Sequence, residues 1–159
     1  MLQDEYEYDL YAKLWRLRPT DVWKPSSEDA PTVHVQYRGP DFVVGYEAGL
    51  FLFVPTSDGS ERPLIWIRRT PCPVDLTEPD VTRANMSELC TLAHERGHEA
   101  SWRAGTYESM TMSEERHAWE HADRILRDLG FKDWCSFEVA KNYSLEMHAK
   151  MGTPEYRSR

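Results

Sequence analysis

The sequence predicts an α+β fold, with a small sheet followed by helices. Between residues 32 and 68 the apolar residues occur in short β-rich runs that glycine, proline and aspartate separate, whereas after residue 80 they recur at helical spacing. The chain has 159 residues, of which 40% are hydrophobic and 29% are charged. This is the size of one ordinary domain and enough apolar material for a core. We therefore expect a single domain over residues 1–159.

The N-terminal segment, residues 4–17, is expected to form a helix, because Leu10 and Leu14 lie at helical spacing and Pro19 prevents its continuation. Residues 20–31 are polar and contain two prolines, which indicates a loop. Four β-rich runs are then expected to form the sheet: residues 32–37, 41–46, 50–54 and 64–68.

Three helices are expected after a proline-containing loop at residues 70–80. Asn85 or Ser87 can cap the first of them. The second begins near Thr111, which has capping-box spacing to Glu114. The approximate ranges of the three helices are residues 85–103, 111–130 and 133–150.

Charge and composition exclude several classes of protein. There are 19 lysines and arginines against 27 acidic residues, and no basic cluster is longer than Arg68-Arg69, so direct binding of nucleic acid is not expected. The longest uncharged stretch, residues 48–57, is too short to span a bilayer, and the acidic N-terminus is unlike a secretory signal. We expect a cytoplasmic protein with no membrane association. Three cysteines without CxxC spacing indicate reduced thiols: Cys72, Cys90 and Cys135.

An HExxH motif, His94-Glu95-Arg96-Gly97-His98, lies within the first of the three later helices. Two imidazoles four residues apart share one helix face and can both reach one Zn²⁺ ion. Glu95 lies beside them and can act as the general base, taking a proton from the attacking water and passing it to the leaving amine. Arg96 and Glu99 are expected to lie on the helix surface. The alternative interpretation is a polar helix face with two solvated histidines.

A catalytic zinc ion usually has three protein ligands, so one more is required. In the helix after Thr111 the apolar stripe begins at Ala118, and Glu115 falls on the same stripe. A carboxylate that faces the core is costly unless a cation compensates it, which predicts Glu115 as the third ligand. Glu114 and Glu120 lie off the stripe. The simpler alternative is an exposed Glu115 that the helix dipole stabilises.

Two other candidates for metal ligands have less support from the sequence. His117 and His121 also stand four residues apart, but they share a face with Arg124, which marks the solvated side of the helix. Cys90 lies one turn before the motif, where a small buried residue is the better explanation.

The residues around the motif resemble a known family. Residues 91–98, Thr-Leu-Ala-His-Glu-Arg-Gly-His, resemble the TLAHExGH signature of ImmA/IrrE-type zinc metallopeptidases. Glu115 and Ala118, with Ala122, are similar to the ExxAxxxA segment that supplies the third zinc ligand in that family. Trp119 departs from the small polar residue that is common there. The resemblance covers residues 64–129 and implies a zincin-like fold.

We therefore expect a zinc-dependent endopeptidase in which His94, His98 and Glu115 hold the zinc ion and Glu95 is the general base. The resemblance implies that the protein or peptide substrate is cleaved in trans and is a regulatory protein, often a transcriptional repressor. One alternative is a catalytically inactive, zincin-like protein-binding module, and another is an acidic helical interaction protein with a chance HExxH. Residue type alone suggests three donors for the oxyanion: Tyr107, Tyr143 and His148.

Overall fold

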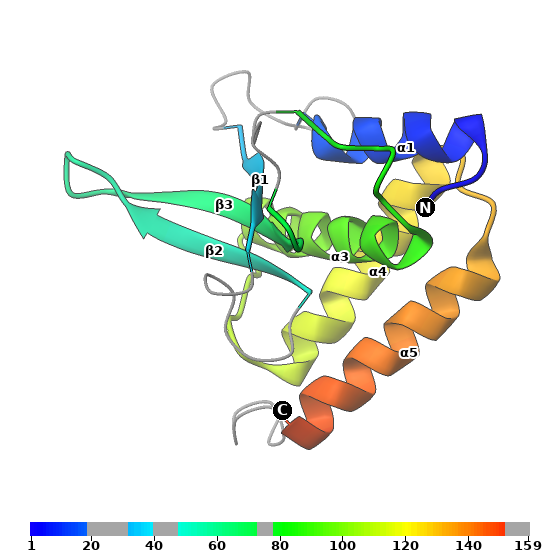
Figure 1. Ribbon diagram of the computed structural model, residues 1–159. Helices are drawn as coiled ribbons and strands as arrows, with labels where there is room; N and C mark the ends of the chain where they lie inside the picture. The colour runs from blue at the N-terminus through cyan, green and yellow to red at the C-terminus, as the bar shows by residue number, and fades with distance from the viewer. Residues whose placement is uncertain (19–31, 40–47, 73–77, 152–159) are drawn as a thin grey trace. The chain divides into compact units, whose positions relative to one another are not determined.

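The computed structural model describes residues 1–18, 32–39, 48–72 and 78–151. Within these residues the fold is α+β, as predicted, with four helices and a three-stranded mixed sheet (Figure 1). No helix in these ranges is long and apolar enough to cross a membrane. The elements in chain order are α1 (Glu5–Trp15), β1 (His34–Arg38), β2 (Gly49–Pro55), β3 (Glu61–Arg68), α3 (Met86–Arg103), α4 (Met112–Asp128) and α5 (Trp134–Met151).

The chain divides into two compact units, Met1–Leu92 and Ala93–Arg159. The first unit contains α1, the sheet and the start of α3, and the second contains the rest of α3 with α4 and α5. The expectation of one domain over the whole chain stays a prediction.

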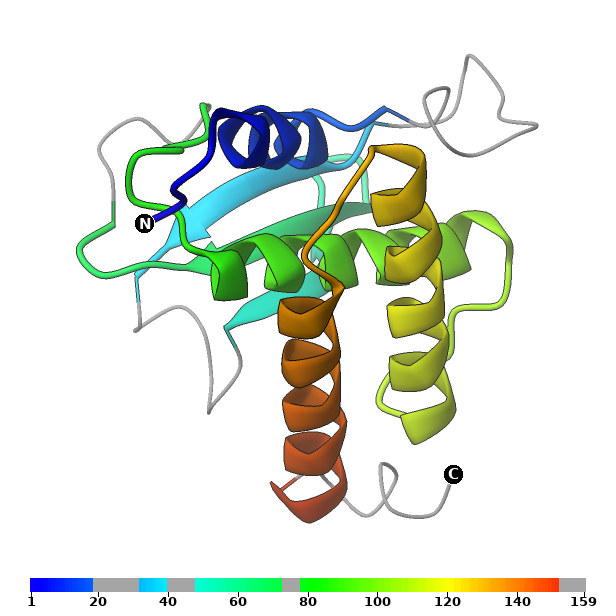
Figure 2. The same cartoon turned by 90° about the vertical axis from the view of Figure 1, so that its right-hand side faces the viewer.

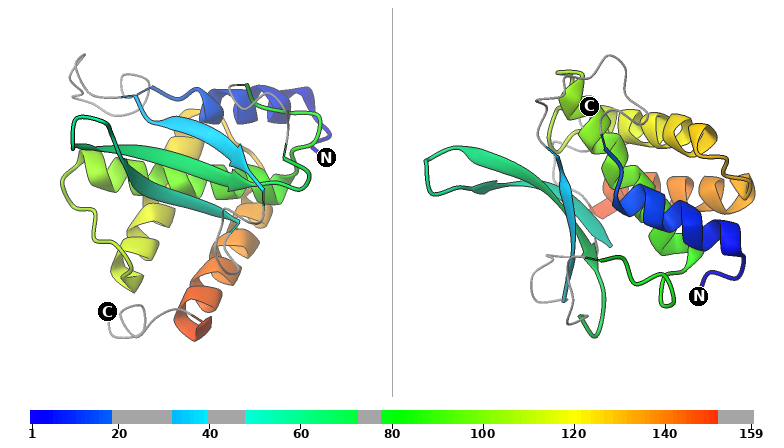
Figure 3. Two further views of the ribbon diagram at one scale, coloured as in Figure 1. Left: turned by 60° about the vertical axis from the view of Figure 1, so that its left-hand side comes forward. Right: turned by 90° about the horizontal axis from the view of Figure 1, so that it is seen from above.

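Strand β3 lies between β1 and β2, pairing parallel with β1 and antiparallel with β2 (Figure 3). Ile65 of β3 is opposite both Val35 and Phe51, and all three side chains are buried. Three of the four predicted β-runs are therefore confirmed. The run at residues 41–46 and the loop at residues 20–31 lie outside the described residues.

In the first unit α1 packs its apolar face against the sheet. Leu10 and Leu14 are buried, as their helical spacing predicts. The ring of Trp15 lies 4.5 Å, centroid to centroid, from the ring of Tyr37 in β1. The helix ends at Trp15, two residues before the predicted Leu17.

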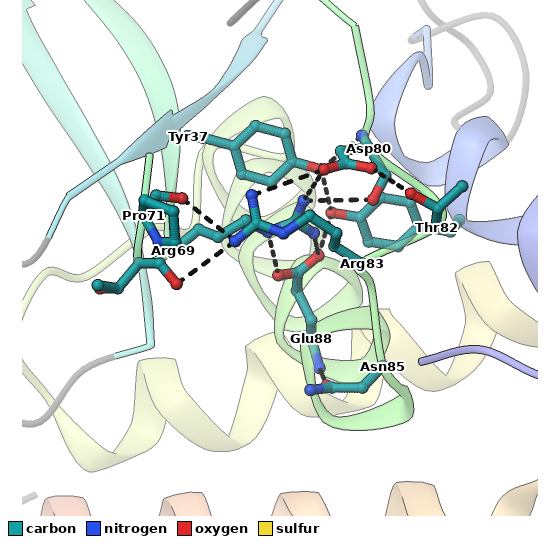
Figure 4. A network of polar contacts seen from close by, with 10 residues as sticks. Tyr37, Arg69, Pro71, Asp80, Thr82, Arg83, Asn85 and Glu88 are labelled. Atoms are coloured by element: carbon teal, nitrogen blue, oxygen red, sulfur yellow. Dashed lines mark hydrogen bonds and ion pairs between the residues drawn. The ribbon is translucent and has the colours of Figure 1, made fainter. Parts of the chain in front are cut away.

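A buried polar network fixes the start of α3 within the first unit (Figure 4). Arg69, 6% exposed, donates from Nε to Glu88 Oε1 of α3 at 3.1 Å and pairs through NH1 with Asp80 Oδ2 at 3.1 Å. Its guanidinium lies 4.1 Å from the centre of the Tyr37 ring, whose hydroxyl contacts that of Tyr11. Burial, together with the nearby Glu88 carboxylate, raises the pKa of Tyr11, so the phenol stays neutral. Two carboxylates thus compensate one buried cation.

Helices α3, α4 and α5 begin and end close to where the sequence predicts. Asn85 caps α3 by accepting from the Glu88 backbone N–H at 2.7 Å, and Thr111 Oγ1 accepts from the Glu114 N–H at 3.0 Å. Positive φ angles follow α3 and α4 at two glycines, Gly105 (76°) and Gly130 (86°).

Helices α4 and α5 lie side by side in the second unit (Figure 2). The ring of Trp119 in α4 contacts Phe137 of α5 edge to face, with 5.5 Å between centroids. The C-terminal half of α3 approaches α4 at Gly97, where an added Cβ would lie 2.0 Å from the carbonyl oxygen of Ala118. Glycine is therefore required at this point of the HExxH motif because any side chain would force the two helices apart.

Candidate metal centre

The HExxH motif lies on a stretch of α3 in which every residue from Leu92 to Ser101 is buried. His94 is 5% exposed, Glu95 is 4% exposed and His98 is 6% exposed. The interpretation of two solvated histidines is therefore wrong. The ligand atoms of these three residues lie within 4.8 Å of one another, so the cluster can hold a metal ion.

Three side chains with potential ligand atoms converge from α3 and α4. The Nε2 atoms of His94 and His98 are 3.1 Å apart. Glu115 Oε2 lies 2.9 Å from His94 Nε2, and Glu115 Oε1 lies 3.5 Å from His98 Nε2. Glu115 is 5% exposed, so the alternative of an exposed first-turn carboxylate is wrong.

These spacings fit a tetrahedral metal ion. Ligand atoms that bind such an ion at about 2.0–2.1 Å lie roughly 3.3 Å from one another, because of the tetrahedral angle. The two nitrogens are 3.1 Å apart, and each lies close to a different oxygen of Glu115, at 2.9 Å for His94 and 3.5 Å for His98, so all three distances are close to that value. Two imidazoles and a carboxylate are also the donor types that zinc prefers. The side chains therefore fit the group that the sequence predicts.

Comparison of the chain with protein-family models, curated proteins and solved structures found no match. The interpretation of this site therefore depends on its own geometry and charge.

The charge of the site favours a cation. Glu95, Glu114 and Glu115 are each 5% exposed or less. Burial, together with the charge of His98, lowers the pKa of His94 to about 4. Burial opposes a proton on His98, but the Glu115 and Glu114 carboxylates outweigh it and hold the pKa of His98 well above its ordinary value. A proton on one imidazole compensates only part of this negative charge, whereas a divalent cation compensates more.

The two histidines are held differently. The ring of His94 stacks on the ring of Trp119, with 4.4 Å between centroids and 25° between planes. Trp119, which departs from the small polar residue of the resembled family, is thus 3% exposed and packs against a candidate ligand. His98 Nδ1 instead donates to Glu114 Oε2 at 2.7 Å.

The structure contradicts the expectation that Arg96 and Glu99 lie on the helix surface. Both are completely buried, and Arg96 NH1 lies 2.7 Å from Glu99 Oε1. The other carboxylate oxygen of Glu99 accepts from Arg103 Nε at 2.9 Å. A charged side chain can be buried when opposite charges compensate it, so charge alone did not indicate the exposed side of α3.

The rival ligand sets are not assembled. His117 is exposed and His121 is partly buried on the polar side of α4. Cys90 is a buried thiol, and Cys72 and Cys135 are exposed thiols. Within residues 1–18, 32–39, 48–72 and 78–151, the close grouping of metal-binding side chains is at His94, Glu95 and His98, with Glu115 beside both histidines.

The three candidate oxyanion donors differ in their exposure and in how close they lie to the candidate ligands. Tyr143 is 66% exposed, which argues against a role at a buried centre. His148 of α5 is 7% exposed, and its Nε2 lies 3.5 Å from Glu115 Oε2. The ring of Tyr107 lies edge to face with His98 at 6.0 Å between centroids. Residue type alone could not separate these three candidates.

Proposed function

We propose that the chain is a zinc-dependent endopeptidase that hydrolyses a peptide bond in a protein or peptide substrate. The observation that carries the proposal is the convergence of His94 Nε2, His98 Nε2 and the Glu115 carboxylate, whose two oxygens lie 2.9 Å and 3.5 Å from these nitrogens, with Glu95 buried nearby. The resemblance to ImmA/IrrE-type metallopeptidases, with their zincin-like fold, supports the same proposal.

Each side chain has a separate chemical role in this proposal. His94, His98 and Glu115 would hold the zinc ion. When bound, zinc supplies positive charge that polarises a peptide carbonyl and increases the acidity of water. Glu95 takes the proton from the attacking water and transfers it to the leaving amine. Its carboxylate is close to both imidazoles, with ligand atoms within 4.8 Å, which supports this role.

His148 and Tyr107 are the side chains best placed to stabilise the oxyanion, because both lie at the centre and both can donate a hydrogen bond. We propose a regulatory protein, such as a transcriptional regulator, as the substrate, which is supplied in trans. That part of the proposal depends on the family resemblance alone.

Removing one motif histidine tests the metal site. His94→Ala and His98→Ala are each expected to abolish stoichiometric zinc binding, because two ligands cannot hold the ion that three hold. His117→Ala and His121→Ala are the matched controls on the polar side of α4, and both should bind zinc as the wild type does. Zinc per chain is measured by elemental analysis after gel filtration. Equal loss from both pairs would exclude the proposed site.

Cleavage is tested with proteins encoded beside the gene as candidate substrates. Wild-type protein with zinc is expected to produce a new N-terminus in one of them, detected by mass spectrometry, and a chelator should stop the reaction until zinc is restored. Zinc binding without cleavage of any candidate would favour the protein-binding module.

Zinc uptake is expected to release close to one proton per chain at pH 7. His98 has a raised pKa in the metal-free protein and is protonated there, whereas His94, with its pKa lowered to about 4, is already neutral. Zinc binds the neutral imidazole, so zinc affinity should increase as the pH rises toward the pKa of His98. Calorimetry in buffers of different ionisation enthalpy measures the proton count. Uptake without proton release at pH 7 would contradict this distribution of charge.

A further inference from the structure

Glu114 is a buried carboxylate next to the predicted third ligand, in the first turn of α4. It is 1% exposed, so both of its oxygens need hydrogen-bond donors. Oε2 accepts from His98 Nδ1 at 2.7 Å, and Oε1 accepts from the backbone N–H of Glu108 at 3.3 Å. Glu114 thus contacts a motif histidine from the side opposite the converging ligand atoms, because Nδ1 and Nε2 are on opposite sides of the ring.

The position of this carboxylate is not explained by helix capping. The spacing of Thr111 and Glu114 predicts a capping box, in which the glutamate would accept from the backbone N–H of the N-cap residue. Only the threonine half of that motif is formed, with Thr111 Oγ1 accepting from the Glu114 N–H. The Glu114 side chain is directed to His98 and to Glu108 instead.

We propose that Glu114 is the positioning residue for His98. By accepting from Nδ1, it holds a proton on that nitrogen, so that Nε2, which faces His94 Nε2 and Glu115, is the nitrogen that loses its proton and offers a lone pair when zinc is bound. A carboxylate on the far nitrogen of a metal-binding histidine fixes the ring orientation and increases its basicity. This inference depends on the proposed metal site, in which His98 is a ligand.

His94 provides an internal comparison for this role. Its Nδ1 has no hydrogen-bond partner among the described residues, and its ring is held by stacking on Trp119. One histidine is therefore oriented by an ionised acceptor and the other by an aromatic face. The loss of Glu114 should consequently affect one ligand and leave the other in place.

The test compares Glu114→Gln with Glu120→Gln, a matched change at an exposed position of the same helix. A glutamine has one acceptor oxygen for the two donors that Glu114 satisfies, and it carries no charge. We expect Glu114→Gln to bind one zinc ion with affinity about 10–100-fold weaker than the wild type, and Glu120→Gln to match the wild type. Zinc affinity is measured by competition with a chromophoric chelator, and the melting temperature of each metal-free protein is measured beside it.

The possible results separate this inference from the proposed function. An unchanged zinc affinity in Glu114→Gln, with a lower melting temperature, would mean that Glu114 stabilises the fold but does not position His98. This result would overturn the inference. Complete loss of zinc would make Glu114 a ligand and would overturn it as well. Absence of zinc binding in the wild type would instead contradict the proposed metal site itself, whatever the variants do.

A second measurement does not depend on the folding of a variant. Long-range ¹⁵N–¹H NMR of the zinc-loaded wild type identifies which nitrogen of each histidine carries the proton. We expect His98 to have a protected Nδ1–H and a zinc-bound Nε2, with the Nδ1–H signal shifted by its ionised acceptor. Coordination of zinc through Nδ1 of His98 would overturn the inference.

Discussion

Turnover of any substrate that the wild type cleaves is expected to fall at least ~10²-fold in Glu95→Gln, while zinc stays bound. Glutamine keeps the shape of the side chain but cannot accept the proton from the attacking water. Glu95 is 4% exposed, so an isosteric change is needed to avoid a cavity beside the two histidines. The rate of product formation and the zinc content are measured on the same preparation.

Glu120→Gln is the control for this change, because it also neutralises one carboxylate but at an exposed position. It should retain full activity and full zinc content. A Glu95→Gln protein as active as the wild type would exclude Glu95 as the general base. Loss of zinc together with activity would mean that Glu95 holds the metal.

Zinc is expected to be lost from Glu115→Ala during dialysis against a competing chelator. The variant removes a carboxylate whose two oxygens approach the Nε2 atoms of His94 and His98, at 2.9 and 3.5 Å. Loss of a direct ligand should weaken zinc binding by well over the 10–100-fold typical of residues that only support a ligand. The expected order of zinc affinity is therefore wild type and Glu120→Ala, then Glu114→Gln, then Glu115→Ala.

Equilibrium dialysis with a zinc-binding dye measures that order. Should Glu115→Ala retain zinc while Glu120→Ala loses it, the assignment of ligands on α4 would be wrong. Equal affinities in all of these variants would show that α4 contributes nothing to the metal.

Local patterns in the sequence predicted the elements that hold the site. Capping residues gave the starts of α3 and α4 to within a few residues, and apolar spacing placed Glu115 on the buried stripe of α4, where it lies beside His94. These predictions succeeded because a helix fixes which of its own residues share a face.

Contacts between helices could not be predicted in this way. Glu114 was expected off the stripe, yet it is buried against His98, because α4 meets α3 on more than one side of its first turn. Arg96 and Glu99 form a buried ion pair, which the apolar periodicity of a single helix does not predict. His148 reaches Glu115 from α5, far along the chain, and nothing in its neighbouring residues indicates this contact.

The most direct test of the metal centre is X-ray absorption at the zinc edge, with elemental analysis, on wild-type protein purified without chelator. We predict one zinc ion per chain, bound by two imidazole nitrogens at about 2.0–2.1 Å and by oxygen, with no sulfur. Protein that binds no zinc, or zinc with a sulfur ligand at about 2.3 Å, would contradict a centre formed by His94, His98 and Glu115.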